Sequence, residues 1–310
     1  MPPFQESPRC VSPFQYLKEH AKEIDLLILR GCYPVNYAPA QIYKSLNPAG
    51  KIYIGLDANS RWMDRIRQND PDFAEFMNSC DVIATSCRAL QQHLNEKWPW
   101  KIEYIPNGYY SYGTKHRAPD YNQKENTILT VSRLGTEQKA TDVLLNAFAM
   151  IADRIPEWNL KLVGNIEGNF SCFIDNFFIK YPQLKNHVLF TGPISDKDTL
   201  FNEYYKAKVF ILTSVIEGGT PNVVAEALRA GCAMITTKFD AWEDVIDKGS
   251  CGMAADINDI PAIAARLHTL CTGNQLPALS ERAYRYGMRN FDMEAIVSKL
   301  YEMLFGGNTL

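Results

Sequence analysis

The chain has 310 residues, about twice the usual length of one domain, so we expect two domains. Apolar residues make up 46% and charged residues 22%, and 32 Lys and Arg against 35 Asp and Glu leave a net charge of −3. This balance excludes a generally basic nucleic-acid binder, and no apolar run approaches the ~18 residues of a membrane-spanning helix. The start lacks a signal-peptide pattern, and the eight cysteines form no Cys-x-x-Cys pair. A cytoplasmic protein with free thiols is therefore expected.

Apolar runs and stretches with helical spacing alternate along the chain. In the first part, strands are predicted at 25–29, 51–56, 81–85 and 102–105, with a helix at 88–97. A segment rich in turn formers and charge follows at 107–125. After it, strands are predicted at 127–132, 159–164, 187–191, 209–213 and 233–236, with helices at 141–153, from about 197, and from 221. This alternation is typical of βαβ units with a parallel sheet, formed twice.

Ligands of open parallel sheets bind where the strands end and the following helices begin. The most informative such loop is 214–231, which follows a predicted strand and opens a helix. Thr220 suits the N-cap of that helix, Pro221 its first position and Gly231 its C-terminal cap. The pair Gly218-Gly219 lets the backbone approach a ligand closely.

The start of this helix is a candidate anion site. The backbone amides of Asn222 and Val223 and the positive helix end would face an anion such as a diphosphate. The alternative is a well-capped helix after a glycine-rich turn. Arg133 and Lys139 follow the first strand of the second half, and they are suited to phosphate oxygens, although such loop cations are often only solvated. In a parallel sheet both loops lie at the same edge, so we expect them to meet one diphosphate.

Taken together, these segments resemble the nucleotide-binding half of retaining GT-B glycosyltransferases of family 4 (glycosyl transferases group 1). The resemblance covers about residues 80–306. It rests on 104–108 (Tyr-Ile-Pro-Asn-Gly), Arg133 and Lys139 six residues apart, 192–194 (Gly-Pro-Ile), the Glu217/Glu226 segment, and the ending 284–291 followed by 292–305.

The resemblance implies an α/β protein of the GT-B class, with two Rossmann-like domains and a cleft between them. The N-terminal, acceptor-side domain would comprise residues 1–118 and be joined by a C-terminal helix at about 290–310. The nucleotide-sugar-binding domain would comprise residues 119–289. The first domain is expected to be shortened, because it lacks the opening strands and glycine-rich loop of the family; either it is a reduced version or the chain is truncated.

The resemblance also implies roles for single residues. Arg133 and Lys139 would bind the donor diphosphate, and Glu217 would contact hydroxyls of the donor sugar; these three are the catalytic candidates. Glu226 would hold the ribose hydroxyls, and the backbone around Pro193 and Ile194 would approach the base. The donor-binding candidates are Glu226, Gly218, Gly219, Thr220, Pro221, Asn222, Val223, Pro193 and Ile194.

Two local departures from the family pattern occur in the second half. Glu217 and Glu226 are nine residues apart, where the family has eight, and the extra residue is expected in the Gly218-Gly219 turn. Glu226 is therefore the safer of the two assignments. Residue 140 is Ala, where the family usually has Gly.

In the first half, residues 51–59 resemble the strand after which many relatives place a His near the reacting sugar. No His is present, and Asp57 and Asn59 are the polar candidates for the acceptor side. A capped turn at Asp57 is the alternative interpretation. Arg61 and Trp62 follow and could line an acceptor site, although Trp62 also fits ordinary packing.

Two Asp-x-Asp patterns, 70–72 and 196–198, match a metal-ligand arrangement of transferases. Both fall where helices should begin, so N-capping is the simpler explanation. With Arg133, Lys139 and a helix end at the leaving group, no metal or other cofactor is required. The five histidines show no metal spacing or Ser/His/Asp pattern. Glycosidase-like catalysis by the paired carboxylates Glu217 and Glu226 is an alternative, but it fits a nucleotide donor less well.

The predicted function is metal-independent, retaining transfer of a hexosyl-type sugar from a nucleoside-diphosphate-sugar. The nucleoside diphosphate of the donor would be UDP or GDP. The acceptor would be a glycan, a lipid or a small molecule. The alternatives are a nucleotide-sugar-binding subunit that needs a partner chain, and a GT-B sugar-nucleotide epimerase or hydrolase. No nucleic acid is expected as a partner, while a peripheral membrane contact and a partner subunit stay open.

Overall fold

The computed structural model describes residues 13–111 and 117–306, and contacts within the chain divide it into two units. The first comprises Met1–Ser86, Leu90–Ile105 and Leu300–Leu310, and the second comprises Cys87–Ala89 and Pro106–Lys299. The contact division therefore comes earlier than the predicted boundary at 118/119. The reason is that residues 107–109 bond within the second unit: Asn107 Nδ2 donates to the Thr220 carbonyl (2.9 Å) and the Tyr109 amide to the Phe291 carbonyl (2.6 Å). The C-terminal segment of the first unit likewise begins at 300 rather than at about 290.

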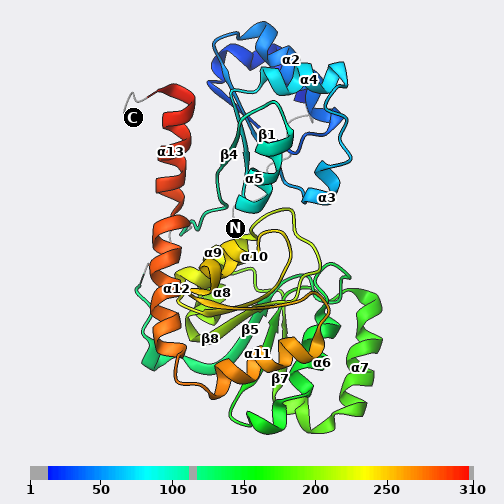
Figure 1. Ribbon diagram of the computed structural model, residues 1–310, viewed down its shortest axis with the longest axis vertical. Coiled ribbons are helices and arrows are strands. Elements are labelled where there is room, and N and C mark those ends of the chain that lie inside the picture. Colours follow the sequence, from blue (N-terminus) through cyan, green and yellow to red (C-terminus); the bar gives the residue numbers. More distant parts are fainter. Residues whose placement is uncertain (1–12, 112–116, 307–310) are drawn as a thin grey trace, which may run out of the picture. The chain divides into compact units, whose positions relative to one another are not determined.

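The first unit is built on a four-stranded parallel sheet in the order β1-β2-β3-β4 (Figure 1). Its strands are β1 Leu26–Arg30, β2 Lys51–Gly55, β3 Val82–Thr85 and β4 Ile102–Tyr104. Its helices are α1 Pro13–His20, α2 Tyr37–Leu46, α3 Ser60–Met63, α4 Pro71–Ser79 and α5 Arg88–Lys97, of which α5 begins in the second unit. All four residues of β3 are buried, as expected for a strand covered on both faces.

The second unit contains a six-stranded parallel sheet in the order β10-β9-β8-β5-β6-β7. The strands are β5 Glu125–Val131, β6 Asn159–Val163, β7 Val188–Gly192, β8 Ala207–Leu212, β9 Ala233–Thr237 and β10 Gly252–Ala255. In this doubly wound arrangement the chain order reverses between β5 and β8, and ligands bind at such a switch point, beyond the carboxyl ends of the strands. All nine predicted strands are present, with ends shifted by at most two residues, and β10 was not predicted.

Helices cover both faces of this second sheet (Figure 1). The helices of the chain from α6 onward are α6 Thr141–Ala149, α7 Ser171–Lys180, α8 Lys197–Lys206, α9 Asn222–Arg229, α10 Trp242–Ile246, α11 Ile260–Thr272, α12 Leu276–Asn290 and α13 Met293–Phe305. The last of these contributes residues to both units. Short 3₁₀ turns, η1 Ala21–Glu23, η2 Pro34–Asn36, η3 Tyr121–Gln123, η4 Ala152–Arg154, η5 Gly168–Phe170, η6 Pro182–Asn186 and η7 Asp247–Gly249, connect the elements.

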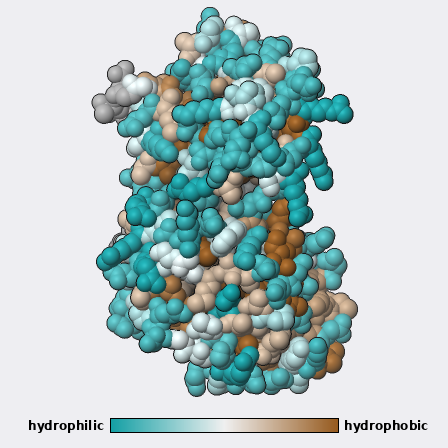
Figure 2. Space-filling model, in the orientation of Figure 1, coloured by the Kyte–Doolittle hydropathy of each residue, from teal (hydrophilic) through white to brown (hydrophobic). Residues whose placement is uncertain are grey.

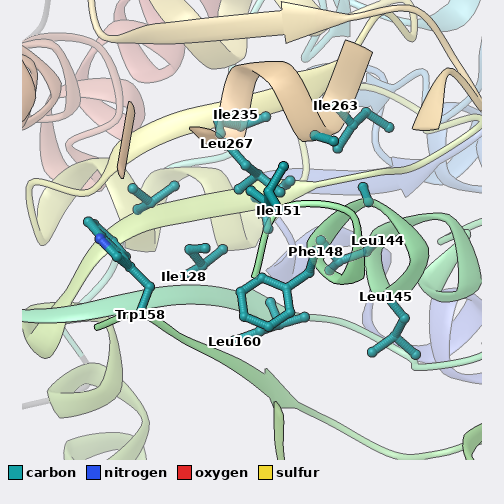
Figure 3. Packing of buried hydrophobic residues seen from close by; sticks show 14 of the residues in the cluster. Ile128, Leu144, Leu145, Phe148, Ile151, Trp158, Leu160, Ile235, Ile263 and Leu267 are labelled. Atoms are coloured by element: carbon teal, nitrogen blue, oxygen red, sulfur yellow. The ribbon is translucent and has the colours of Figure 1, made fainter. Parts of the chain in front are cut away.

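The core of the second unit lies between the sheet and the pair α6 and α11. Ile128 on β5 and Ile235 on β9 pack with Phe148 on α6 and Leu267 on α11, and each of these side chains is at most 1% exposed (Figure 3). Truncation of one such side chain costs about 2–5 kcal/mol, so this core contributes strongly to the stability of the second unit.

The helix α9, which begins near the switch point, ends in a regular C-terminal cap. The Gly231 amide donates to the Leu228 carbonyl (2.9 Å) and the Cys232 amide to the Ala227 carbonyl (3.0 Å), while Gly231 has φ +65°. These are the two bonds of a Schellman motif, which needs a left-handed residue. The prediction of Gly231 as the C-terminal cap of this helix is confirmed.

The remaining general expectations can be compared with the described residues. The cysteines among them form no disulfide. No helix in the ranges 13–111 and 117–306 is long and apolar enough to cross a membrane. On the face drawn in Figure 2, hydrophilic residues cover most of the surface and hydrophobic ones form separate patches.

Candidate functional site

Two loops meet at the switch point of the second sheet, one after β5 and one after β8. The Val215 amide donates to the Gln138 carbonyl (2.8 Å). Thr213 Oγ1 donates to the carbonyls of Lys139 (3.0 Å) and Ala140 (3.1 Å). The placement of both loops at one sheet edge, expected from the parallel topology, is therefore confirmed by neighbouring strands and direct bonds.

Glu217 is buried in this junction, with 8% of its surface exposed. Its Oε1 accepts hydrogen bonds from Lys139 Nζ and from Ser214 Oγ (2.6 Å). Its Oε2 accepts one from Gln138 Nε2 (3.1 Å). A buried carboxylate is stable only when charge and hydrogen bonds compensate the loss of water. These donors supply both, so Glu217 is held in one orientation.

Arg133 lies at the exposed side of the same junction. Its Nη2 donates to Gln138 Oε1 (2.9 Å), so the Gln138 carboxamide lies between the Arg133 guanidinium and the Glu217 carboxylate. The structure thus brings Arg133, Lys139 and Glu217 together. The sequence analysis did not identify Gln138 or Ser214, because uncharged polar residues in a loop carry no signal by type alone.

The loop after β5 reaches this place through an unusual backbone. Gly135 has φ +88°, and a Cβ added there would lie 2.3 Å from the ring of Phe170. Ala140, at the start of α6, has φ +45° and ψ +51°, a left-handed conformation that L-residues adopt at a cost. This explains the departure noted at residue 140: the position requires a conformation that glycine adopts freely.

The helix α9 begins one residue later than predicted. Pro221 has ψ 146° and is the N-cap, so Asn222 is the first helical residue, and the expectation of Thr220 as N-cap and Pro221 as first residue was wrong. Pro221 is extended because its carbonyl turns to accept the Val224 amide (3.0 Å). No hydrogen bond to the amides of Asn222 or Val223 occurs among the described residues. Both amides therefore remain the donors of this helix end.

The backbone conformation before α9 explains why residue 219 is a glycine. Gly219 has φ +147°, which is accessible to glycine. Thr220 is buried, and its carbonyl accepts the Asn107 side-chain amide (2.9 Å). The Asn107 hydrogen bond thus holds the turn at Thr220, directly before α9.

Glu226 lies in the second turn of α9 and is half-buried. Its Oε2 accepts a hydrogen bond from Tyr204 Oη on α8 (2.7 Å), a contact that the sequence analysis missed. Burial raises the pKa of the Glu226 carboxyl, while the Tyr204 hydrogen bond and the charge of Lys197 oppose the rise. The other oxygen, Oε1, has no hydrogen bond from any residue in the described ranges.

The loop at Pro193 and Ile194 connects β7 to α8. It follows Gly192, which has φ +72° and whose carbonyl accepts the Gly164 amide (3.0 Å). Pro193 is exposed and Ile194 half-buried. Because the strands are parallel, this loop lies at the same sheet edge as Arg133, two strands from β5.

Both Asp-x-Asp patterns are helix N-termini. Asp196 accepts from the Thr199 amide (2.8 Å) and starts α8, and Asp70 accepts from the Asp72 (3.0 Å) and Phe73 (3.2 Å) amides and starts α4. The capping interpretation is therefore confirmed. Across residues 13–111 and 117–306 there is no group of three or more His, Cys, Asp and Glu side chains that could hold a metal ion.

The two acceptor-side candidates lie in the first unit and have different local roles. Asn59 is the N-cap of α3 and accepts the Trp62 amide (3.0 Å). Asp57 does not cap a helix; it forms an ion pair with Arg30 Nη1 (3.4 Å), which the sequence analysis did not predict. Burial raises the pKa of Asp57, and the Arg30 charge and hydrogen bond act against this.

Comparison with known proteins agrees with this geometry. Residues 125–272 match the family described as Glycosyl transferases group 1. A phosphatidyl-myo-inositol mannosyltransferase of Mycolicibacterium smegmatis is 26% identical over 209 residues, which are 65% of this chain and 52% of the relative. An uncharacterized glycosyltransferase of Haemophilus influenzae is 24% identical over 228 residues, or 72% and 61% of the two chains. The chain thus spans about half the length of the curated relatives it matches.

Solved structures give the fold. A crystal structure of S. aureus TarM in complex with UDP and other ligands superposes with a TM-score of 0.74 at 16% identity, covering 95% of this chain and 58% of that one. Sucrose-phosphate synthase from Thermosynechococcus elongatus gives 0.70 at 19% identity, covering 99% and 82%. The chain therefore has the GT-B glycosyltransferase fold, and its residues 125–272 match the family model described as Glycosyl transferases group 1.

Proposed function

We propose that the protein is a retaining glycosyltransferase that moves a hexosyl-type sugar from a nucleoside-diphosphate-sugar to an acceptor. The observation that carries this proposal lies at the switch point, before the start of α9: Lys139 pairs with the buried Glu217 carboxylate, and Gln138 connects Arg133 to the same carboxylate. The match of residues 125–272 to the family described as Glycosyl transferases group 1 supports it.

The diphosphate would lie against Arg133, Lys139 and the first turn of α9. Arg133 is exposed, and its fork of N–H donors suits phosphate oxygens. The amides of Asn222 and Val223 add fixed partial charge at a helix N-terminus. As the bond to the sugar breaks, negative charge grows on the leaving phosphate, and donors already in place stabilise it without rearrangement.

The donor sugar and nucleoside would occupy the two sides of this diphosphate. Glu217, held by three donors, would accept a sugar hydroxyl. Glu226 would accept the ribose hydroxyls through Oε1, and the backbone at Pro193 and Ile194 would contact the base. In a retaining front-face transfer the leaving phosphate takes the acceptor proton, so no enzyme base is needed.

The acceptor would be a glycan, a lipid or a small molecule, with Asp57 and Asn59 as the candidate residues on the acceptor side. We further propose that transfer needs no metal ion, because Arg133 and Lys139 supply the positive charge that a divalent ion would otherwise bring to the diphosphate.

A thermal-shift panel followed by product analysis tests the proposal. UDP-sugars come first, because the TarM structure contains UDP, and GDP-mannose comes second, because the relative from Mycolicibacterium smegmatis is a mannosyltransferase. A ligand that raises the melting temperature is then incubated with and without acceptors. Transfer with retained anomeric configuration supports the proposal. Release of free sugar or an epimerised donor in the absence of acceptor, or binding of no nucleotide sugar, would overturn it.

A further inference from the structure

Gln138 forms hydrogen bonds to both loops that meet at the switch point, and the proposed function gives it no role. Its Oε1 accepts from Arg133, and its Nε2 donates to Glu217 Oε2 (3.1 Å) and to the Ile216 carbonyl (3.1 Å). Its backbone carbonyl accepts the Val215 amide (2.8 Å). One residue therefore bonds both to the cation that follows β5 and to the carboxylate that follows β8.

A carboxamide is suited to this position for an electrostatic reason. It is neutral, and it presents an acceptor on one side and donors on the other. A carboxylate in its place would accept from Arg133 but would repel Glu217, and an ammonium group would repel Arg133 and Lys139. The Gln138 side chain can satisfy a cation and an anion at the same time without adding charge.

The contacts also limit what Glu217 can still bind. A carboxylate accepts about four hydrogen bonds, two on each oxygen. Oε1 already accepts from Lys139 and Ser214, and Oε2 accepts from Gln138. Among the contacts of residues 13–111 and 117–306, one acceptor direction of Glu217 remains, on Oε2, and the Gln138 bond fixes where it points.

We propose that Gln138 is a positioning residue that joins the diphosphate end of the donor site, at Arg133, to the sugar end, at Glu217. This inference rests on the proposed function, which assigns a donor diphosphate to Arg133 and a sugar hydroxyl to Glu217. Through the Oε2 bond, Gln138 directs Glu217 to one hydroxyl of the donor sugar. Loss of Gln138 should therefore weaken recognition of the sugar more than recognition of the nucleoside diphosphate.

The first experiment compares two ligands that differ only in the sugar. Calorimetric titration is carried out with UDP and UDP-glucose, or with GDP and GDP-mannose if the wild type prefers that pair. Gln138→Met keeps the length of the side chain and removes both hydrogen-bonding functions. We expect the affinity for the nucleotide sugar to fall about tenfold, as for one hydrogen bond to a charged group, and that for the bare diphosphate to fall less than threefold.

The second experiment measures how kcat/KM depends on pH, because a purely structural role of Gln138 would not change this dependence. Gln138→Glu retains the acceptor for Arg133 but places a second carboxylate against Glu217. Two carboxylates at hydrogen-bond distance share a proton when the pH is lowered, and the protonated group donates as the amide did. We expect kcat/KM of this variant, as a fraction of the wild-type value, to rise at least fivefold between pH 8 and pH 5.5.

Glu137→Gln is the matched control, because it changes the charge of the neighbouring exposed residue without entering these contacts. It should leave the ratio of the two affinities and the pH profile unchanged. Equal weakening of both ligands by Gln138→Met, or a flat pH ratio for Gln138→Glu, would overturn the role of Gln138. If Gln138→Met does not fold, the pH ratio decides alone. A wild type that binds neither nucleotide pair would instead refute the proposed function.

Discussion

Tyr204 donates its hydroxyl proton to Oε2 of Glu226 across 2.7 Å, from the buried side of α8 to the second turn of α9. Tyr204 is fully buried, and burial, together with the nearby Glu226 charge, raises its pKa well above the ordinary value. It is therefore a permanent neutral donor. The bond fixes one oxygen of Glu226 and leaves Oε1 for another partner.

Glu226→Ala should weaken binding of the nucleotide sugar by about 1.5–3 kcal/mol, the range for hydrogen bonds to a charged group. The effect on folding should be smaller, because the substitution also removes a carboxylate that is costly to bury. Calorimetric titration measures the first effect and denaturant unfolding the second. Glu203→Ala, which removes a carboxylate paired with Lys161 at 2.5 Å, is the control. Unchanged affinity in folded Glu226→Ala would remove Glu226 from the site.

The raised pKa of Glu226 gives donor binding a pH dependence. Affinity should fall as the pH is lowered through the folded pKa, since the protonated carboxyl is a weaker acceptor. Tyr204→Phe removes the bond that lowers this pKa, so the fall should move to higher pH. For stability the sign is opposite: the contribution is fully present below the ordinary value of 4.5 and is lost as the pH rises through the folded pKa. Glu226→Gln should therefore stabilise the unliganded protein at pH 7. Donor affinity and the free energy of unfolding are measured from pH 5 to 8. An affinity that does not fall at low pH, or a Glu226→Gln variant that is no more stable than the wild type at pH 7, would contradict the prediction.

Transfer activity should persist in excess EDTA. The physical reason is that Arg133 and Lys139 are held by Gln138 and Glu217. In the proposed site they would supply the positive charge at the diphosphate. Initial rates with and without chelator make the comparison. Loss of turnover that Mg²⁺ or Mn²⁺ restores would contradict the proposed role of these two cations.

Arg133 and Lys139 should both affect kcat as well as affinity, because their contacts strengthen as charge grows on the leaving group. Lys139→Met should also destabilise the fold by roughly 3 kcal/mol, since it leaves the buried Glu217 without its cation, whereas Arg133→Met should not. If both residues act on one diphosphate, as proposed, the double variant should lose less kcat/KM than the sum of the single losses.

Arg133→Lys should not restore the wild-type rate if the guanidinium fork matters. Circular dichroism establishes that the variants are folded before the rates are compared. Small additive losses, near the few tenths of a kcal/mol of solvated surface charges, would show that the two residues are ordinary loop cations.

Ala140→Gly should change the free energy of unfolding by less than about 1 kcal/mol. Relief of the left-handed strain gains ~1–2 kcal/mol, and added chain entropy and a lost methyl cost ~1 and ~0.8 kcal/mol. Ala147→Gly, in the buried interior of α6, gains nothing and should cost about 2 kcal/mol. Denaturant unfolding of both variants tests this, and equal losses would mean that Ala140 is not strained in solution.

Much of the second unit could be predicted because its signals are local. Apolar runs bounded by turn formers marked five of its six strands, and Asp196 before a helical stretch marked the start of α8. β10 was missed because Gly-Met-Ala-Ala is short and carries no strong strand pattern. The start of α9 was shifted by one residue because a proline fits both the N-cap and the first helical position.

By itself, the sequence determined which residue types follow each strand: Arg133 and Lys139 after β5, and Glu217 after β8. Capping, periodicity and turn preferences act over a few residues, so they are written in the local order of the chain. The tertiary structure alone decided which of these residues meet. Gln138 bonds to Glu217 79 positions away, and Tyr204 bonds to Glu226 from a different helix. Such pairings depend on β5 lying beside β8 and on α8 packing against α9, which no local interaction specifies.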